Sequence, residues 1–285
     1  MLRVRPRSEP ARLLDDRDRA AAQAICDADP VTNVFVASRI RALGLEPGRL
    51  GAQIWGFSEG DGQLTSLCYA GANLVPVQAT PAAIVAFAER ALRQGRRCSS
   101  IVGPATVVTE LWGYLRPRWG PAREVRAAQP LMAIDGPPLV APDPAVRRVR
   151  LAELDVLMPA CVAMFTEEVG ISPLTGDGGA AYRARVAELI RSGRAFARIE
   201  DGRVIFKAEV GAATPQASQI QGVWVRPDRR GQGFAAPGMA AVVNAARESI
   251  APIVSLYVND FNAPGRATYR RAGFVETGVF MSVLF

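Results

Sequence analysis

The spacing of hydrophobic positions along the chain predicts one order of helices and strands, repeated twice. In the first half, apolar residues recur at intervals of three and four in helical segments, and short apolar runs between turn residues indicate strands. The order is two helices, three strands, a helix, a strand, a helix and a strand. These elements are expected over residues 17–27, 31–44, 52–57, 63–71, 73–79, 80–95, 98–103, 106–115 and 122–134.

The second half repeats this order, which predicts two domains of similar fold. Helices are expected over residues 151–169 and 176–193, a two-stranded hairpin over 195–212, a strand over 217–225, a helix ending near 249, a strand over 252–258, a helix over 263–273 and a final strand over 274–285. Hairpin turns at Asp61-Gly62 and Asp201-Gly202 fall at equivalent places. Residues 135–144, rich in proline and glycine, are typical of a linker.

These patterns predict the fold class and the domain boundaries. We expect an α/β (α+β) protein in which each domain is a mixed, mostly antiparallel sheet flanked by helices. The two domains are predicted over residues 1–140 and 145–285.

The composition narrows the cellular setting. A chain of 285 residues with 49% hydrophobic residues can bury a substantial core, and no apolar run reaches the ~18 residues of a membrane-spanning helix. The charged N-terminus lacks the apolar stretch of a secretory signal. We therefore expect a cytoplasmic protein, monomer or homodimer, that does not engage a membrane. The net charge is +7, but the chain has no dense run of basic residues with interleaved aromatics, so we expect no nucleic-acid partner. Binding of an anionic cofactor would explain the positive charge equally well.

The side-chain inventory excludes several chemistries. The chain has no histidine, which removes Ser-His-Asp and Cys-His catalysis and any histidine base. No C-x-x-C pair or other short-range cluster of metal ligands occurs, so no metal site is predicted. Carboxylates, tyrosine, cysteine, the single lysine or a water relay are left to move protons.

One glycine-rich stretch, VRPDRRGQGFAAPGM, follows the strand over 217–225 and opens a helix. Gly231 and Gly233 permit unusual backbone angles and a close approach of the backbone to a ligand. Amides at a helix start lack intrahelical partners and carry the positive end of the helix dipole. Together these features favour a phosphate site, to which Arg226, Arg229 and Arg230 would add attraction, although an ordinary strand-to-helix loop has a similar composition. The spacing fits neither the dinucleotide fingerprint nor the P-loop.

Two motifs resemble those of the GNAT superfamily of N-acyltransferases. GVWVRPDRRGQGFA is similar to the acyl-CoA-binding motif, with Arg230, Gly233 and Ala235 at matching positions. Downstream, YVNDFNAPGRATYRRAGF is similar to a second motif, N-x-x-A-x-x-x-Y-x-x-x-G-F, with Asn262, Tyr269, Gly273 and Phe274 in place and Gly265 in the alanine position. The resemblance covers residues 150–285. In the first half of the chain, the segment PVQATPAAIVAF stands where the acyl-CoA-binding motif would be, and it lacks the glycines and arginines of that motif. We therefore expect the first domain to be a degenerate copy of the second that serves as a scaffold or a substrate wall.

The resemblance implies an acetyl-CoA-dependent N-acetyltransferase in which a neutral amine attacks the thioester directly. The CoA pyrophosphate would bind the amides of Arg230, Gly231, Gln232, Gly233, Phe234 and Ala235, and the oxyanion a backbone amide of Val223, Trp224 or Val225. Tyr269 would protonate the leaving thiolate, or else is an aromatic packed under the sheet. Asn262 would contact the pantetheine arm, or only cap its helix.

The base and the substrate contacts rest on weaker signals. Lys207, the only lysine among 34 lysine and arginine residues, lies two positions from Glu209 on a strand, so both point to one face. Glu209 could take the amine proton, with Lys207 adjusting its pKa, or the two form an exposed ion pair. Glu167 and Glu168 lie where the family usually places substrate contacts and would suit a cationic amine; solvated charges at a helix end are the alternative.

We therefore predict an N-acetyltransferase that acts on a primary amine of a small molecule or protein. Two alternatives remain open at this point: a mycothiol-synthase-like enzyme that acetylates a small thiol-bearing amine, and a non-catalytic CoA-binding sensor or interaction module.

Overall fold

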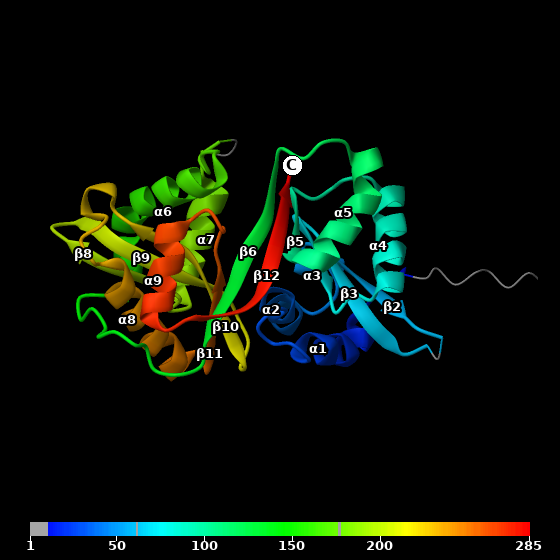
Figure 1. Ribbon diagram of the computed structural model, residues 1–285, viewed down its shortest axis with the longest axis horizontal. Coiled ribbons are helices and arrows are strands. Elements are labelled where there is room, and N and C mark those ends of the chain that lie inside the picture. The colour runs from blue at the N-terminus through cyan, green and yellow to red at the C-terminus, as the bar shows by residue number, and fades with distance from the viewer. Residues whose placement is uncertain (1–10, 61, 176–177) are drawn as a thin grey trace, which may run out of the picture. The chain divides into compact units, whose positions relative to one another are not determined.

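The computed structural model describes residues 11–60, 62–175 and 178–285, and these divide into two compact units (Figure 1). The first unit runs to Pro130 and also includes Gly278–Phe285, whereas the second is Leu131–Thr277. Two long strands, β6 (Glu124–Ile134) and β12 (Val275–Leu284), therefore contribute residues to both units.

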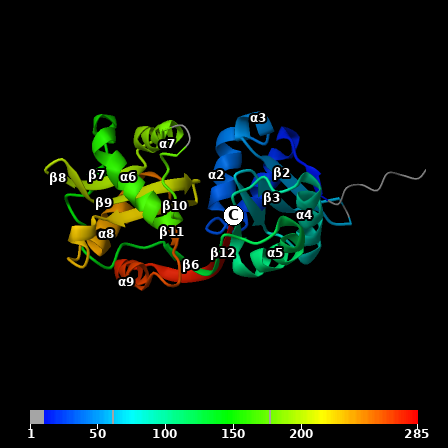
Figure 2. The same ribbon diagram turned by 90° about the horizontal axis from the view of Figure 1, so that it is seen from above.

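The first unit is a mixed sheet with helices on both faces. Its strand order is β1-β2-β3-β4-β5-β12, in which only β4 and β5 are parallel among the described pairs. Phe87, Leu111 and Val283 belong to a core that packs α4 and α5 against the sheet, and Ile40 and Leu67 belong to a second core under α1 and α2 (Figure 2). The bounds are β1 Ala11–Leu13, α1 Arg19–Asp27, α2 Val34–Leu43, α3 Pro47–Leu50, β2 Gln53–Ser58, β3 Leu64–Ala70, β4 Asn73–Val77, α4 Pro81–Gln94, β5 Ser100–Pro104 and α5 Ala105–Trp119.

The second unit repeats this arrangement. From β6 its strand order is β11-β10-β9-β8-β7, and β10 with β11 is its parallel pair. Helices α8 and α9 pack on one face through residues such as Phe206 and Met239, while α6 and α7 pack on the other through Leu157 and Val186. The bounds are β7 Arg147–Arg148, α6 Leu154–Val169, α7 Ala180–Arg191, β8 Ala195–Glu200, β9 Arg203–Ala213, β10 Ala217–Val225, α8 Ala235–Ser249, β11 Ile253–Tyr257 and α9 Ala263–Ala272.

The mixed, mostly antiparallel fold predicted from the sequence is confirmed, and each predicted helix and strand has a counterpart. The short elements β1, α3 and β7 were not predicted, because three- and four-residue segments carry too little periodicity. The Asp201-Gly202 turn has φ of 48° and 69°, as a two-residue hairpin turn requires, whereas Asp61 lies outside the described residues.

The predicted domain boundary and the compact units differ in one respect. The sequence boundary falls in the segment 135–144, but the contacts divide the chain after Pro130 and return Gly278–Phe285 to the first unit. The physical reason is strand pairing: β12 pairs with β5 from Phe280↔Pro104 to Leu284↔Ser100, and β6 pairs with β11 through Leu131–Ile134.

Candidate active site

The central feature of the second unit is a pair of parallel strands that part after three residues. Strands β10 and β11 are paired only from Ala217↔Ile253 to Gln219↔Ser255. Beyond Gln219, β10 remains paired with β9 on its other side as far as Val225. The edge of β10 from Ile220 to Val225 thus has no strand neighbour toward β11 among the described residues, and its backbone groups there can serve a ligand.

A β-bulge deforms β10 where the strands part. The register with β9 shifts between Gln221 and Trp224, and Gly222 in this bulge has φ of 61°. A Cβ at Gly222 would lie 3.2 Å from Lys207 Nζ and 3.3 Å from Glu209 Oε2. Glycine is therefore required both by the backbone angle and by the crowding beneath it.

The turn after β10 leaves a run of amides unused. The backbone N–H groups from Gly231 to Ala236 donate no hydrogen bond to any residue that the structure describes; the first α8 bond at this end runs from the Gly238 N–H to the Phe234 carbonyl, at 3.0 Å. Gly231 and Gly233 have φ of 75° and 85°, and nothing lies within 4 Å of a Cβ built on either. The turn predicted to bind an anion therefore presents free donors and open space.

Each of the three arginines around this turn has a carboxylate partner. Arg226 pairs with Asp228 at 2.8 Å, Arg229 approaches Glu200 at 3.9 Å, and Arg230 pairs with Glu167 at 2.7 Å. The Arg230 Nε also donates to the Val225 carbonyl at 3.0 Å. The pairing reduces the positive field that we expected from the sequence, so the amides carry more of any anion binding.

The two carboxylates at the end of α6 each accept hydrogen bonds from side chains of other segments. Glu167 accepts from Trp224 Nε1 at 3.3 Å in addition to Arg230, and Glu168 accepts from Asn259 Nδ2 at 3.1 Å. Glu167 was expected to contact substrate and Arg230 to contact the cofactor; the structure joins the two in one ion pair.

Lys207 and Glu209 form a buried ion pair beneath the bulge. Lys207 Nζ lies 2.5 Å from Glu209 Oε1 and 3.4 Å from Cys161 Sγ, and both charged side chains are almost fully buried. Burial lowers the pKa of Lys207, but Glu209 and Cys161 raise it by more, so its ammonium form is favoured. The sequence left open an exposed ion pair between these two residues. The pair does form, but it is buried, because α6 covers this face of the sheet.

Glu209 has one oxygen left for other partners. Its Oε1 receives Lys207 Nζ and, at 3.5 Å, the Cys161 Sγ, whereas Oε2 has no hydrogen-bond partner among the described residues. Cys161 itself is a protonated thiol, since burial raises its pKa to about 12.

Tyr269 projects from α9 into the core that α8 and α9 share. Its ring packs edge-on against Phe274, with ring centroids 6.1 Å apart, and burial followed by the charge of Glu168 raises the pKa of its hydroxyl. The hydroxyl makes no hydrogen bond with any described residue. A phenol held in its neutral form can donate a proton but cannot act as a base near pH 7.

Asn262 caps α9. Its Oδ1 accepts the Gly265 N–H at 2.9 Å, and a Cβ at Gly265 would lie 2.8 Å from the Asn262 side-chain amide nitrogen. The glycine in place of the alanine of the family motif therefore relieves crowding against the cap.

Sequence reasoning missed three residues of this site. Cys161 completes the Lys207–Glu209 pair, Asn259 holds Glu168, and Gly222 forms the bulge. A glycine inside a strand pattern is a signal for a bulge and could have been recognised. Neither Cys161 nor Asn259 stands out in the sequence, because each meets its partner from a distant segment.

Residues 179–274 match the family described as the acetyltransferase (GNAT) family, and residues 52–157 match a domain of unknown function, DUF4081. Residues 179–274, which lie in the second unit, thus form a GNAT domain. No curated protein matched the chain.

Several solved structures share the GNAT fold over nearly the whole chain at low identity. A Drosophila protein is 14% identical with a TM-score of 0.66 and covers 98% of this chain and 99% of its own. A tandem GNAT protein from the clavulanic acid biosynthesis pathway is 14% identical with a TM-score of 0.57, over 96% and 98%. A GCN5-related N-acetyltransferase from Sphaerobacter thermophilus is 18% identical with a TM-score of 0.57, over 95% and 93%. These likenesses extend over both units, and one of the structures is itself a tandem GNAT protein.

No helix in the described ranges is long and apolar enough to cross a membrane. Likewise, no cluster of three or more Cys, Asp or Glu side chains within those ranges could hold a metal ion.

Proposed function

We propose that this GNAT protein transfers an acetyl group from acetyl-CoA to a primary amine in its second unit. The observation that supports this best is the combination of the parted strands β10 and β11 with the unused amides from Gly231 to Ala236. The first provides a backbone edge for an extended arm, and the second provides donors for a pyrophosphate. A bulky residue in place of either turn glycine would fill the open space that these donors border.

The chain's own groups divide the binding among four segments: strand β10, the turn after it, the start of α9 and the end of α6. Amides from Gly231 to Ala235 bind the pyrophosphate, whereas the Arg230 amide, expected to join them, already donates to the Pro227 carbonyl at 3.3 Å. The free edge of β10 receives the pantetheine arm, with Asn262 at the start of α9 as a further contact. A backbone amide among Val223, Trp224 and Val225, just past the bulge, stabilises the oxyanion. Glu167 and Glu168 bind the cationic acceptor before its reacting amine loses a proton.

Acetyl-CoA supplies the acetyl group as a thioester: the amine nitrogen bonds to the carbonyl carbon, the C–S bond breaks, and the thiol leaves. Glu209 takes the amine proton at Oε2, the oxygen that Lys207 leaves free, through a water molecule. Lys207 holds the carboxylate in place from the other oxygen. Tyr269 donates its hydroxyl proton to the leaving sulfur and recovers one from solvent, a role that its neutral form suits.

Calorimetry with acetyl-CoA tests the binding part of the proposal. Wild type should bind at micromolar concentration, and Gly233→Trp should lose at least tenfold in affinity because the indole fills the space over the amides. Gly202→Trp is the matched control: Gly202 also has positive φ and open space around its Cβ position, but it lies in the β8–β9 turn. Absence of micromolar binding by wild type would refute the proposal, as would equal losses in the two variants.

Release of free thiol tests catalysis. With a panel of amines and peptides, Tyr269→Phe should lower turnover by about 10²-fold, the scale of general acid catalysis. Acetyl-CoA affinity should stay within about threefold, since the phenyl ring keeps the packing against Phe274. A wild-type protein that binds acetyl-CoA but releases no thiol with any amine would instead be a non-catalytic binding module.

A further inference from the structure

The first unit contains a cavity of about 440 Å³ that the proposed acetyl transfer does not use. It lies at the C-terminal ends of α4 and α5 and at the start of β4, whereas the segment that replaces the acyl-CoA motif in this unit leads into the N-terminus of α4. The cavity is therefore separate from the place where a GNAT cofactor would bind in this copy. Its volume suits a small ligand rather than a whole CoA molecule.

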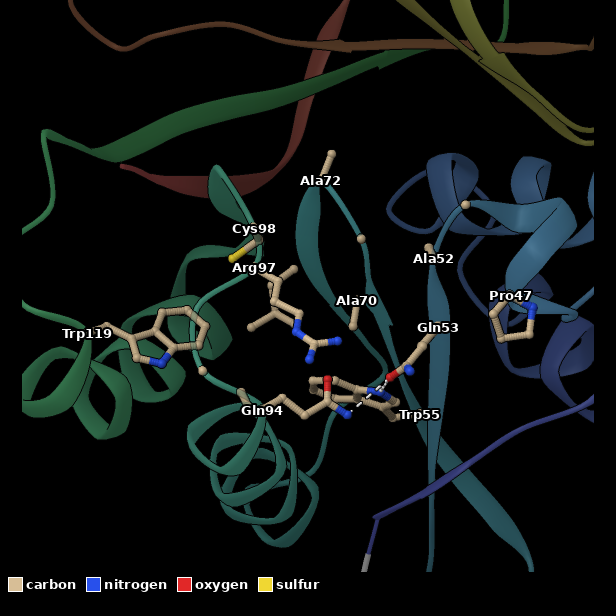
Figure 3. A pocket seen from close by; sticks show the side chains of 15 residues that line it. Pro47, Ala52, Gln53, Trp55, Ala70, Ala72, Gln94, Arg97, Cys98 and Trp119 are labelled. Carbon is tan, nitrogen blue, oxygen red and sulfur yellow. Dashed lines mark hydrogen bonds between the residues drawn. The ribbon is translucent and has the colours of Figure 1, made fainter.

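The walls combine flat apolar surface with a few polar groups. Trp119 contributes a partly exposed indole ring, whereas Trp55 and Leu74, which also line the cavity, are each 2% exposed. Gln53 Oε1 accepts from Trp55 Nε1 at 2.8 Å and from Gln94 Nε2 at 3.2 Å, which fixes the amides and leaves Gln53 Nε2 and Gln94 Oε1 for a ligand. Figure 3 shows Gln94 directed toward Gln53 and Trp55 across the cavity.

The charge of the cavity is positive and unpaired. Arg97 alone carries a charge among the described residues that line it, and no acidic side chain is among them. Arg97 has no ion pair or hydrogen bond with any described residue, although most arginines near carboxylates in this chain are paired. In Figure 3 its guanidinium points toward Gln53 and Gln94 and not away from the cavity. A guanidinium in this position favours a carboxylate, which it can bind through two parallel hydrogen bonds.

The lining groups together favour one kind of ligand. Arg97 favours an acid, Gln94 Oε1 can accept a hydrogen bond from the ligand, and the partly exposed ring of Trp119 favours a flat body.

We propose that this cavity is a binding site for a small aromatic carboxylate, with its acid group on Arg97, its ring against Trp119, and a ring donor on Gln94 Oε1. The acid group and the flat ring are both needed, because Arg97 supplies the charge and the Trp119 ring supplies the apolar contact. The site belongs to the first unit and does not depend on acetyl transfer in the second.

A matched pair of probes tests the proposal. Indole-3-acetate and indole-3-acetamide have nearly the same shape and differ in charge, so calorimetry on the full chain separates the carboxylate from the ring. We expect the acid to bind at least tenfold more tightly than the amide, the scale of a hydrogen bond to a charged group. Arg97→Gln should reduce the affinity for the acid to that for the amide, whereas Arg118→Gln, which removes an equal charge from an exposed position outside the cavity, should not.

The indole N–H resonances locate the bound probe. The chain has four tryptophans, and in nitrogen–proton correlation spectra only those of Trp55 and Trp119 should shift. Trp112 and Trp224, which do not line the cavity, serve as internal controls, and unchanged spectra of Arg97→Gln without probe establish that the variant is folded. Equal affinity for acid and amide, shifts confined to other tryptophans, or no binding of either probe would each overturn the proposal.

Discussion

Replacement of Lys207 by methionine should lower the free energy of unfolding of the second unit by about 3–5 kcal/mol, the usual cost of stranding one charge of a buried pair. The magnitude follows from the contact: Lys207 Nζ and Glu209 Oε1 lie 2.5 Å apart with side chains 1% and 6% exposed. At an effective dielectric constant of about 20, that distance gives an attraction of roughly 6–7 kcal/mol, part of which compensates the desolvation of lysine itself. Because methionine fills much of the same volume as lysine, the loss of stability would come mainly from the unpaired charge and not from a cavity.

The double variant Lys207→Met/Glu209→Leu is the control. Because it removes both charges, its stability should return to within about 1 kcal/mol of wild type or exceed it.

Urea unfolding read by hydrogen exchange in peptides of β9 and β10 measures these differences in the second unit alone. A loss below about 1 kcal/mol in the single variant would contradict the reasoning. So would a double variant as unstable as the single one, which would mean that packing, not charge, sets the cost.

Two further predictions concern packing and titration. Gly238→Ala should destabilise the second unit by about 1–2 kcal/mol, because the added Cβ would lie 2.9 Å from atoms of the Phe206 ring. The higher helix propensity of alanine offsets only part of this overpacking. A urea unfolding midpoint above that of wild type would contradict the prediction. Cys161 should resist iodoacetamide at pH 8 in the folded chain and react in urea, since burial holds its thiol pKa near 12; rapid native alkylation, read by mass spectrometry, would be the opposite result. The folded state holds that proton more tightly, so stability should fall as pH rises above the ordinary value of 9.0.

Local structure was predictable from the sequence because its signals are local. Thr80 caps α4 and Gly95 follows it, and β10 begins and ends at the residues that the apolar pattern indicates. The side-by-side placement of Lys207 and Glu209 also followed from the two-residue repeat of a strand.

Contacts between distant segments were not predictable in the same way. Glu167 and Arg230 are 63 residues apart, and nothing in either segment indicates that they pair. Gly238 lies against the ring of Phe206, which is 32 residues away, and nothing in the sequence around either residue indicates this contact. The burial of Lys207 depends on α6 covering that face of the sheet, which the strand pattern alone does not reveal.

The return of β12 to the first unit has a consequence for biosynthesis. Leu284 pairs with Ser100, and Gly278–Phe285 complete a sheet whose other strands are made far earlier. The ribosome must therefore finish the whole of the second unit before β5 gains this neighbour. Until then β5 presents an unpaired edge, a template for wrong partners, and the pairing that closes it spans a long sequence separation and forms slowly. The second unit can mature first, and the first unit must wait for it.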